Sequence, residues 1–372
     1  MTLAMAVQMT SYNRKSNEDV KGSSTCSSSS SQDDLIAKGF VQAADEFLFD
    51  INTGNASKKT IGEFVRSFSK SSVFSEFVTF TDYSILRNRN CWSFYEHPLL
   101  NRFYEIPLFE ATRIKVPHES GHDYIHASEV DGFRERGKFI ITQAPLAAST
   151  EQFWLMQWLN KVPIVVSLTE MVDENKLPIL PKKRGESMKL GKISIEILHC
   201  RHVRNSYDSA VLKIQHDNEP PRKLLLLSFH SWGHKGTPRR PTELLDLVAD
   251  VNYNRELLRR QAIAGQWLKP DEKFPVTLMC FSGVGRSCVV AGLDVLCRRL
   301  EASAALGTPL VDVLDTVKRV RIQRAGAFPK PEQYLYLSMA VLEFGIRTKL
   351  IPNNVLNQID LINYMHQQNE ME

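Results

Sequence analysis

The fold is decided by one stretch of the chain, VTLMCFSGVGRS, which runs from Val276 to Ser287. Its β-branched beginning predicts a strand over Val276–Met279, its two glycines mark a loop, and the apolar residues that follow predict a helix over about residues 287–305. Such a loop binds anions, because its N–H groups point inward and the helix dipole adds partial positive charge. The stretch therefore predicts an anion-binding site.

Cys280 and Arg286 lie in this loop, six positions apart. A thiol in an electropositive loop is partly ionised to the nucleophilic thiolate, and an arginine fork can hold two phosphate oxygens. We expect Ser287 to donate a hydrogen bond to the thiolate. We expect the phosphate to be bound by Phe281, Ser282, Gly283, Val284, Gly285 and Arg286. These groups predict attack of sulfur on phosphorus, with a cysteinyl-phosphate intermediate.

Three other glycine-loop motifs do not fit the stretch. A nucleotide P-loop needs lysine after its last glycine, and here Arg286 follows Gly285. A dinucleotide fingerprint needs a third glycine where Cys288 stands, and a hydrolase elbow needs glycine where Cys280 stands. The structural alternative is a buried cysteine in a tight turn between a strand and a helix.

The loop and the segments around it resemble the classical protein tyrosine phosphatases, whose signature is HCxxGxGR followed by serine or threonine. The similar blocks occur in the family's order over roughly residues 60–348. They are Asn101–Phe103, Asp123–Ser128, Thr142–Leu146 with Phe153–Trp154, Trp232–Pro238, Cys280–Ser287 and Gln323–Tyr334. The resemblance implies an α/β (α+β) fold, a twisted mixed β-sheet flanked by helices on both faces. It also implies tyrosine-phosphorylated proteins as partners.

Three catalytic positions depart from the family pattern. His234 stands where the family has its general-acid aspartate, and Met279 stands where a histidine precedes the cysteine. Pro329 replaces the glutamine that orients the hydrolytic water. A positioned general acid typically contributes about 100- to 10,000-fold to the rate. The departures therefore predict slow hydrolysis.

The binding positions are kept or replaced by similar residues. Phe103 takes the place of the recognition tyrosine, Glu105 that of an aspartate that grips the substrate backbone, and Gln333 matches the family's second glutamine. The pattern predicts a pocket that holds phosphotyrosine with weak or no hydrolysis. Two alternatives stay open: an active phosphatase in which His234 protonates the leaving oxygen, and a scaffold protein with a vestigial pocket.

The chain divides into four parts by composition and resemblance. A serine-rich tail over residues 1–33 is expected to be disordered, and residues 34–59 are expected to form a helical extension. The phosphatase-like domain spans 60–348, and a polar tail spans 349–372. Within the domain, periodicity predicts strands at 112–116, 124–127, 139–142, 164–168, 193–198, 210–215 and 223–229. It predicts helices at 150–159, 242–264, 310–323 and 331–345.

Composition narrows the remaining possibilities. The 372 residues carry 46 basic and 42 acidic side chains, which is too balanced to favour nucleic acid. No apolar run approaches the ~18 residues of a membrane span. Six cysteines without a Cys-x-x-Cys pair favour a reduced, cytoplasmic location. The histidines are dispersed, so we expect no metal site and no cofactor. The sequence makes no prediction of the oligomeric state.

Overall fold

The computed structural model describes residues 47–53, 57–68, 75–77, 89–172, 175, 177–204, 206–232, 236–238 and 240–351. The serine-rich tail lies outside these ranges, as does all but residues 349–351 of the polar C-terminal tail. Of the expected helical extension, residues 47–53 and 57–59 are described, and they contain turns and the start of a short strand.

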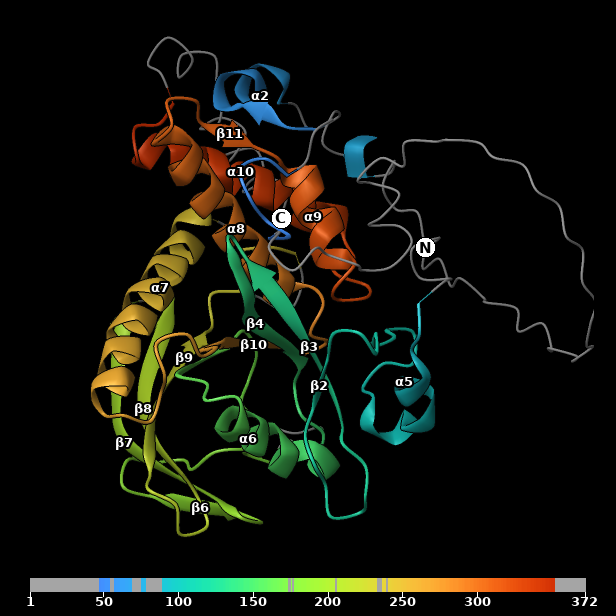
Figure 1. Ribbon diagram of the computed structural model, residues 1–372, viewed down its shortest axis with the longest axis vertical. Coiled ribbons are helices and arrows are strands. Elements are labelled where there is room, and N and C mark those ends of the chain that lie inside the picture. The colour runs from blue at the N-terminus through green and yellow to red at the C-terminus, as the bar shows by residue number, and fades with distance from the viewer. Residues whose placement is uncertain are drawn as a thin grey trace, which may run out of the picture.

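Within the described ranges, nine strands form one mixed sheet (Figure 1). In spatial order they are β2 (Arg113–Lys115), β3 (Tyr124–Gly132), β4 (Glu135–Gln143), β10 (Val276–Cys280), β5 (Ile164–Ser167), β9 (Arg222–Phe229), β8 (Tyr207–His216), β7 (Ile193–Arg204) and β6 (Ser187–Leu190). Neighbours from β4 to β9 pair in parallel, and the pairs on either side are antiparallel. The carboxyl ends of β10 and its two neighbours therefore meet at one edge.

Strand β10 lies at the centre of this sheet and is buried along its whole length. Val276 and Leu278 pack into the core on one face, while Met279 packs into the core on the other. Both faces are covered, which explains why the sequence reads as a continuous apolar run rather than as an alternation. This buried position fixes where the chain leaves the sheet after Cys280.

Helices cover both faces of the sheet. One core cluster contains residues of the four helices α7 (Pro241–Ala264), α8 (Arg286–Ala304), α9 (Val313–Arg321) and α10 (Pro331–Arg347). The opposite cluster is built on α6 (Thr150–Leu159). Figure 1 shows α6 apart from the other four, across the sheet. The predicted fold class, a twisted mixed sheet between helices, is confirmed.

The remaining described elements are short. They are β1 (Lys59–Thr60), α2 (Ile61–Ser67), α5 (Trp92–Glu96), β11 (Leu310–Val311) and two 3-10 turns, η1 (Pro98–Leu100) and η2 (Ala147–Ser149). The helix predicted over 310–323 was wrong at its beginning, because β11 pairs with β1 there. Asp312 then caps α9 by accepting a hydrogen bond of 2.9 Å from the Asp315 N–H.

Asp312 gives the fold a testable pH dependence. Its carboxylate is buried and also accepts a hydrogen bond from Ser57 Oγ at 2.7 Å. Burial raises the pKa of Asp312 to about 6. The folded state therefore takes up a proton that an unfolded carboxyl binds only near pH 4. The stabilisation from this group is complete below about pH 4 and is lost as the pH rises through about 6.

We accordingly expect Asp312→Asn to raise the free energy of unfolding at pH 7.5 by about 1 kcal/mol and to leave it unchanged at pH 4. Urea unfolding of both proteins across this range measures the difference. Asp271→Asn makes the same charge change at an exposed position and serves as the control. An equal effect of Asp312→Asn at both pH values would show that Asp312 does not titrate as described.

Candidate active site

Cys280 is the last residue of β10 and lies at the carboxyl edge of the parallel strands. Its side chain is buried, with 2% exposed. Its sulfur accepts a hydrogen bond from the Gly283 N–H, with 3.2 Å between nitrogen and Sγ. The chain curls around the thiol so that a backbone donor points at it.

Gly283 allows the loop to lie directly against β4. Its φ is +71°, which favours glycine, and a Cβ there would lie 2.6 Å from the backbone nitrogen of Gln143. Gly285, the N-cap of α8, has a φ of −92°, and a Cβ there would meet only the Gln333 side chain, at 2.8 Å from Nε2. The two glycines of the motif therefore have different roles.

A fully buried arginine, Arg324, holds the loop from behind. Its Nε donates to the Gly283 carbonyl at 3.0 Å, and its other nitrogens donate to Ser128 Oγ at 3.1 Å and to His126 Nδ1 at 2.9 Å. Because Nδ1 accepts, Nε2 of His126 donates to the Ile106 carbonyl, at 3.0 Å. This chain of bonds ties the loop to the segment that contains Phe103.

His126 stays neutral in this position. Burial, together with the charge of Arg324, lowers the pKa of His126 to about 3. A neutral ring is what the bonds require, because one nitrogen accepts and the other donates. The sequence placed both residues in blocks similar to the phosphatases, but it assigned neither a role. Only the packing of distant segments reveals their function as a support.

Arg286 begins α8 and is half buried. One of its terminal nitrogens, Nη1, donates to the Leu168 carbonyl at 2.7 Å, and its Cζ lies 6.0 Å from the centre of the Trp232 ring. Burial lowers the pKa of Arg286 from its ordinary value of 12.5, and a guanidinium keeps its charge at neutral pH. The bond to Leu168 fixes the guanidinium to the residue that follows β5 (Ile164–Ser167).

Two buried polar atoms beside the loop have no hydrogen-bond partner among the described residues. They are Ser287 Oγ and Gln333 Oε1. The expected bond from Ser287 to the thiol is therefore not formed in this structure. Buried polar groups are nearly always paired, so an unpaired one needs a specific reason. A bound anion would accept a hydrogen bond from the Ser287 hydroxyl, and a bound water would donate one to Gln333 Oε1.

The rim of the loop is aromatic. The rings of Phe103 and Phe281 meet edge to face with 5.6 Å between their centres, and the Arg102 guanidinium lies 4.6 Å from the Phe281 ring centre. Phe281 is 51% exposed, and Glu105 is exposed on the same segment as Phe103. The Arg102 N–H donates to Gln143 Oε1 at 3.0 Å, which fixes this segment at the end of β4. The structure thus places Phe103 beside the loop.

The general-acid position cannot be placed in the same way. His234 lies outside the described residues, together with Gly233 and Lys235. On either side of them, Trp232 Nε1 donates to the Gly236 carbonyl at 3.1 Å. Pro329, at the water-orienting position, is exposed just before α10. Its ring offers no hydrogen-bonding side chain in any conformation.

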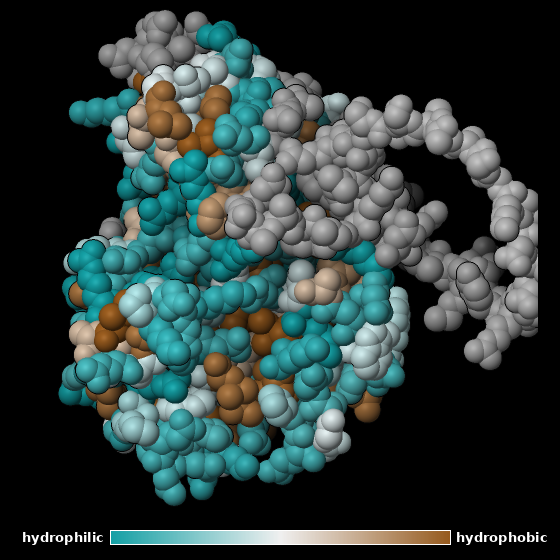
Figure 2. Space-filling view, viewed as in Figure 1, coloured by the Kyte–Doolittle hydropathy of each residue, from teal (hydrophilic) through white to brown (hydrophobic). Residues whose placement is uncertain are grey.

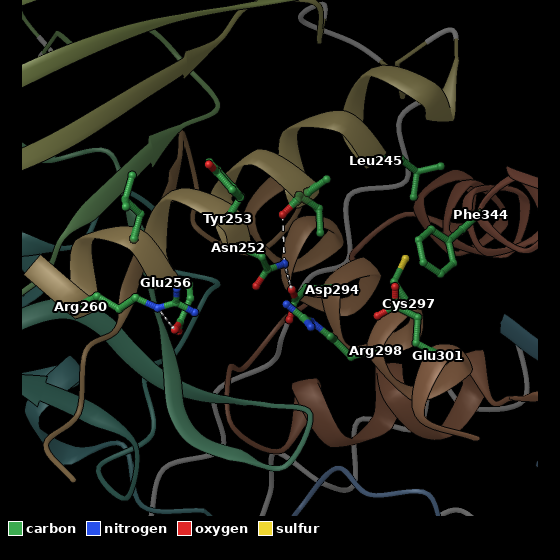
Figure 3. Close-up of a pocket in the computed structure, with 13 residues that line it drawn as sticks. Leu245, Asn252, Tyr253, Glu256, Arg260, Asp294, Cys297, Arg298, Glu301 and Phe344 are labelled. Atoms are coloured by element: carbon green, nitrogen blue, oxygen red, sulfur yellow. Dashed lines mark hydrogen bonds and ion pairs between the residues drawn. The ribbon is translucent and has the colours of Figure 1, made fainter. Parts of the chain in front are cut away.

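A separate cavity of about 470 Å³ lies between α7, α8 and α10. Figure 3 shows Asn252 joined to Asp294 across it, and Arg260 paired with Glu256 along α7. None of its lining residues belongs to the loop between Cys280 and Arg286. The cavity is therefore distinct from the predicted anion-binding site, here called the cradle, which is the loop from Cys280 to Arg286.

The contrast between the two glycines gives a matched pair of variants. Gly283→Ala should displace the loop, because the new methyl group meets backbone atoms of β4 that cannot move away. The strained backbone alone costs about 1–3 kcal/mol. Gly285→Ala should cost less, because the flexible Gln333 side chain can move. Thermal unfolding and the rate of Cys280 alkylation measure both effects. Equal losses in the two variants would contradict this reading of the loop.

Comparison with known proteins agrees with this geometry. The family described as protein-tyrosine phosphatase matches residues 97–343. The chain is 31% identical over 263 residues to mouse tyrosine-protein phosphatase non-receptor type 9, covering 68% of this chain and 43% of the mouse protein. The figures for the human protein are 31% over 261 residues, with 68% and 42% covered.

Receptor-type members are similar as well. Zebrafish receptor-type tyrosine-protein phosphatase F is 29% identical over 251 residues, which cover 66% of this chain and 12% of the zebrafish protein. The matched residues include the loop from Cys280 to Arg286, the buried Arg324 behind it and the aromatic rim of Phe103 and Phe281. The chain therefore belongs to the classical protein tyrosine phosphatase family. It spans less than half the length of these relatives.

The surface adds one observation. Among the described helices, none is both long enough and apolar enough to cross a bilayer. On the face shown in Figure 2, hydrophobic residues form separate patches within a largely hydrophilic surface. Large exposed apolar side chains are spread over many elements.

Proposed function

We propose that this domain binds phosphotyrosine side chains of partner proteins and hydrolyses them weakly or not at all. The observation that carries the proposal is the contrast within one site. The residues expected to bind phosphate are retained, and they include Cys280, whose sulfur accepts a hydrogen bond from a backbone N–H, and Arg286 at the start of α8. The positions that drive hydrolysis hold His234 and Pro329 instead of the family's aspartate and glutamine.

Binding is supported by the groups that surround the loop. A phosphate at the cradle would meet the cation of Arg286, the positive end of the α8 dipole and the backbone N–H groups of the loop. The Ser287 hydroxyl is buried, has no partner among the described residues and would donate to a phosphate oxygen. Phe103 and Phe281 form an aromatic rim that would stack against a tyrosine ring.

Weak hydrolysis is supported by the chemistry of the two steps. The leaving tyrosine oxygen needs a proton, and the family's aspartate supplies it. The attacking water then needs a hydrogen-bonding group, which the Pro329 ring lacks. The runner-up is an active enzyme in which His234 gives the proton, since an unperturbed imidazole titrates near neutral pH. The turnover measurements in the Discussion separate these two proposals.

A cytoplasmic location also remains a proposal. All the cysteines in the described part of the chain are free: Cys91, Cys200, Cys280, Cys288 and Cys297. Free thiols persist in reducing compartments, and the tyrosine-phosphorylated partners proposed here would be encountered there.

Arg286→Ala is expected to weaken binding of a phosphotyrosine peptide by at least ~10-fold. Each hydrogen bond to a charged group contributes about 1.5–3 kcal/mol, and 1.4 kcal/mol corresponds to one decade of affinity. Calorimetry with the peptide and its unphosphorylated twin measures the loss. Arg260→Ala removes the same charge from an exposed position and should bind normally. Equal affinity of the wild-type protein for the twins would instead favour a scaffold with a vestigial pocket.

A further inference from the structure

Three side chains of types that can bind metal ions lie close together at one end of the antiparallel part of the sheet. His202 on β7 and Asp208 on β8 are directly opposite each other in the strand register. Asp208 is also opposite Ser228 on β9. His230 follows Ser228 by two positions, so the alternation of side chains puts it on the same face. The sequence predicted no metal site because these residues are dispersed along the chain, and the sheet brings them together.

The donor atoms are close enough to share one ion. One ligand atom from each of His202, Asp208 and His230 lies within 4.8 Å of the others. The Asp208 carboxylate is 2.5 Å from His202 Nδ1 and, through its other oxygen, 3.8 Å from His230 Nε2. The two imidazole rings are nearly parallel, at an interplanar angle of 9° and a centroid distance of 6.3 Å. The carboxylate therefore lies between two nitrogens.

The backbone under these side chains is held in place. The N–H of His230 donates to the Ser206 carbonyl at 3.0 Å, and the N–H of Ser231 donates to the same oxygen at 3.3 Å. His202 and Asp208 lie in strands that pair along ten residue positions. Ligands carried by paired strands keep their spacing better than ligands on loops.

We propose that His202, Asp208 and His230 bind a divalent transition metal ion, with Zn²⁺ as the ion that suits them. Two imidazole nitrogens and one carboxylate oxygen are ligands that zinc accepts, and three protein ligands leave a fourth position for water. All three side chains are exposed, so an ion reaches them directly from solvent. The proposal does not depend on phosphotyrosine binding.

The proposed metal site lies close in sequence to a residue that contacts Arg286. His230 comes two residues before Trp232, whose ring faces Arg286. A bound ion would tie the ends of β7 and β8 to the residue that follows β9. An ion that binds only the folded state also stabilises that state, so Zn²⁺ is expected to raise the melting temperature of the full chain.

Calorimetric titration of the full chain with Zn²⁺ tests the proposal. Thiols are competing ligands, so the parent protein for this test carries Cys26→Ser, Cys200→Ser and Cys280→Ser. We expect one ion per chain. Loss of an outer-shell partner alone weakens metal sites by 10–100-fold. His202→Ala, Asp208→Ala and His230→Ala should therefore each weaken binding by at least ~10-fold.

His199→Ala is the matched control, because it removes another exposed histidine from β7. It should bind Zn²⁺ as the parent does. Titration with Co²⁺ should give visible d–d absorption that each of the three ligand variants loses. Melting curves without metal verify that each variant folds. No binding by the parent, or unchanged binding by the three variants, would show that the cluster is only a set of hydrogen-bonded surface side chains.

Discussion

Replacing His234 with aspartate and Pro329 with glutamine is expected to raise the steady-state turnover of an aryl phosphate by about 100-fold or more, the low end for one general acid. The aspartate would protonate the departing tyrosine oxygen and speed formation of the phosphoenzyme. The glutamine would orient water and speed its breakdown. Because these are successive steps, each change alone should help only until the other step limits the rate.

The measurement compares the double variant, the two single variants and the wild type, with Cys280→Ser as the blank. Gly233→Pro is added in a further variant, since the segment must close in the right shape to deliver the acid. Two results would contradict the account. One is wild-type turnover already near ~10 per second, the typical enzyme median. The other is no gain in the repaired variants although they still bind phosphopeptide.

Lys138→Met is expected to lower the free energy of unfolding by about 3–5 kcal/mol, because it leaves a buried carboxylate without its partner. Lys138 on β4 lies 2.6 Å from Asp294 on α8, and both side chains are almost fully buried. Asn252 on α7 completes the group, since its Nδ2 donates to Asp294 and its Oδ1 accepts from Lys138 at 2.9 Å. The pair thus anchors the helix that begins at Arg286.

The contribution of Asp294 to the stability of the fold depends on pH. Burial acts to raise the pKa of Asp294, but the charge and hydrogen bond of Lys138 more than offset it, and the net pKa is below its ordinary value. The stabilisation from Asp294 is therefore present at neutral pH. It is lost only as the pH falls below the ordinary carboxyl range, about pH 4.

A double-mutant cycle tests the Lys138 prediction. Lys138→Met with Asp294→Leu removes both charges, and apolar replacement of a whole buried pair is often neutral or stabilising. The double variant should therefore regain most of the loss seen with Lys138→Met alone. Urea unfolding provides the free energies. A loss below about 1 kcal/mol in the single variant, or no recovery in the double, would show that the pair is not coupled as the distances indicate.

The local parts of this molecule could be predicted from the sequence. The strand over 276–279, the glycine loop and the following helix occur as expected, because β-branched runs, glycines and apolar periodicity act over a few neighbouring residues. The helix over 150–159 begins and ends where it was expected. The structure also places Phe103 against Phe281 of the Cys280 loop and Gln333 against Gly285.

Contacts between distant segments could not be predicted. Arg324 bonds the Gly283 carbonyl of the loop and also His126, which is almost 200 residues away in sequence. Leu310 is not helical as predicted, because it pairs with Thr60 in the short sheet of β1 and β11. Neither contact leaves a periodic signal in the chain, since each depends on the geometry of the folded core. The same is true of His202, Asp208 and His230, which only the strand register brings together.

One experiment tests the central proposal directly. A phosphotyrosine peptide is mixed with excess wild-type protein, and native mass spectrometry follows the bound peptide and its phosphate over time. We predict that the complex carries intact phosphopeptide for many minutes and that the unphosphorylated twin forms no comparable complex. Loss of the phosphate within seconds, or equal binding of the twin, would contradict a phosphotyrosine-binding domain with weak or no hydrolysis.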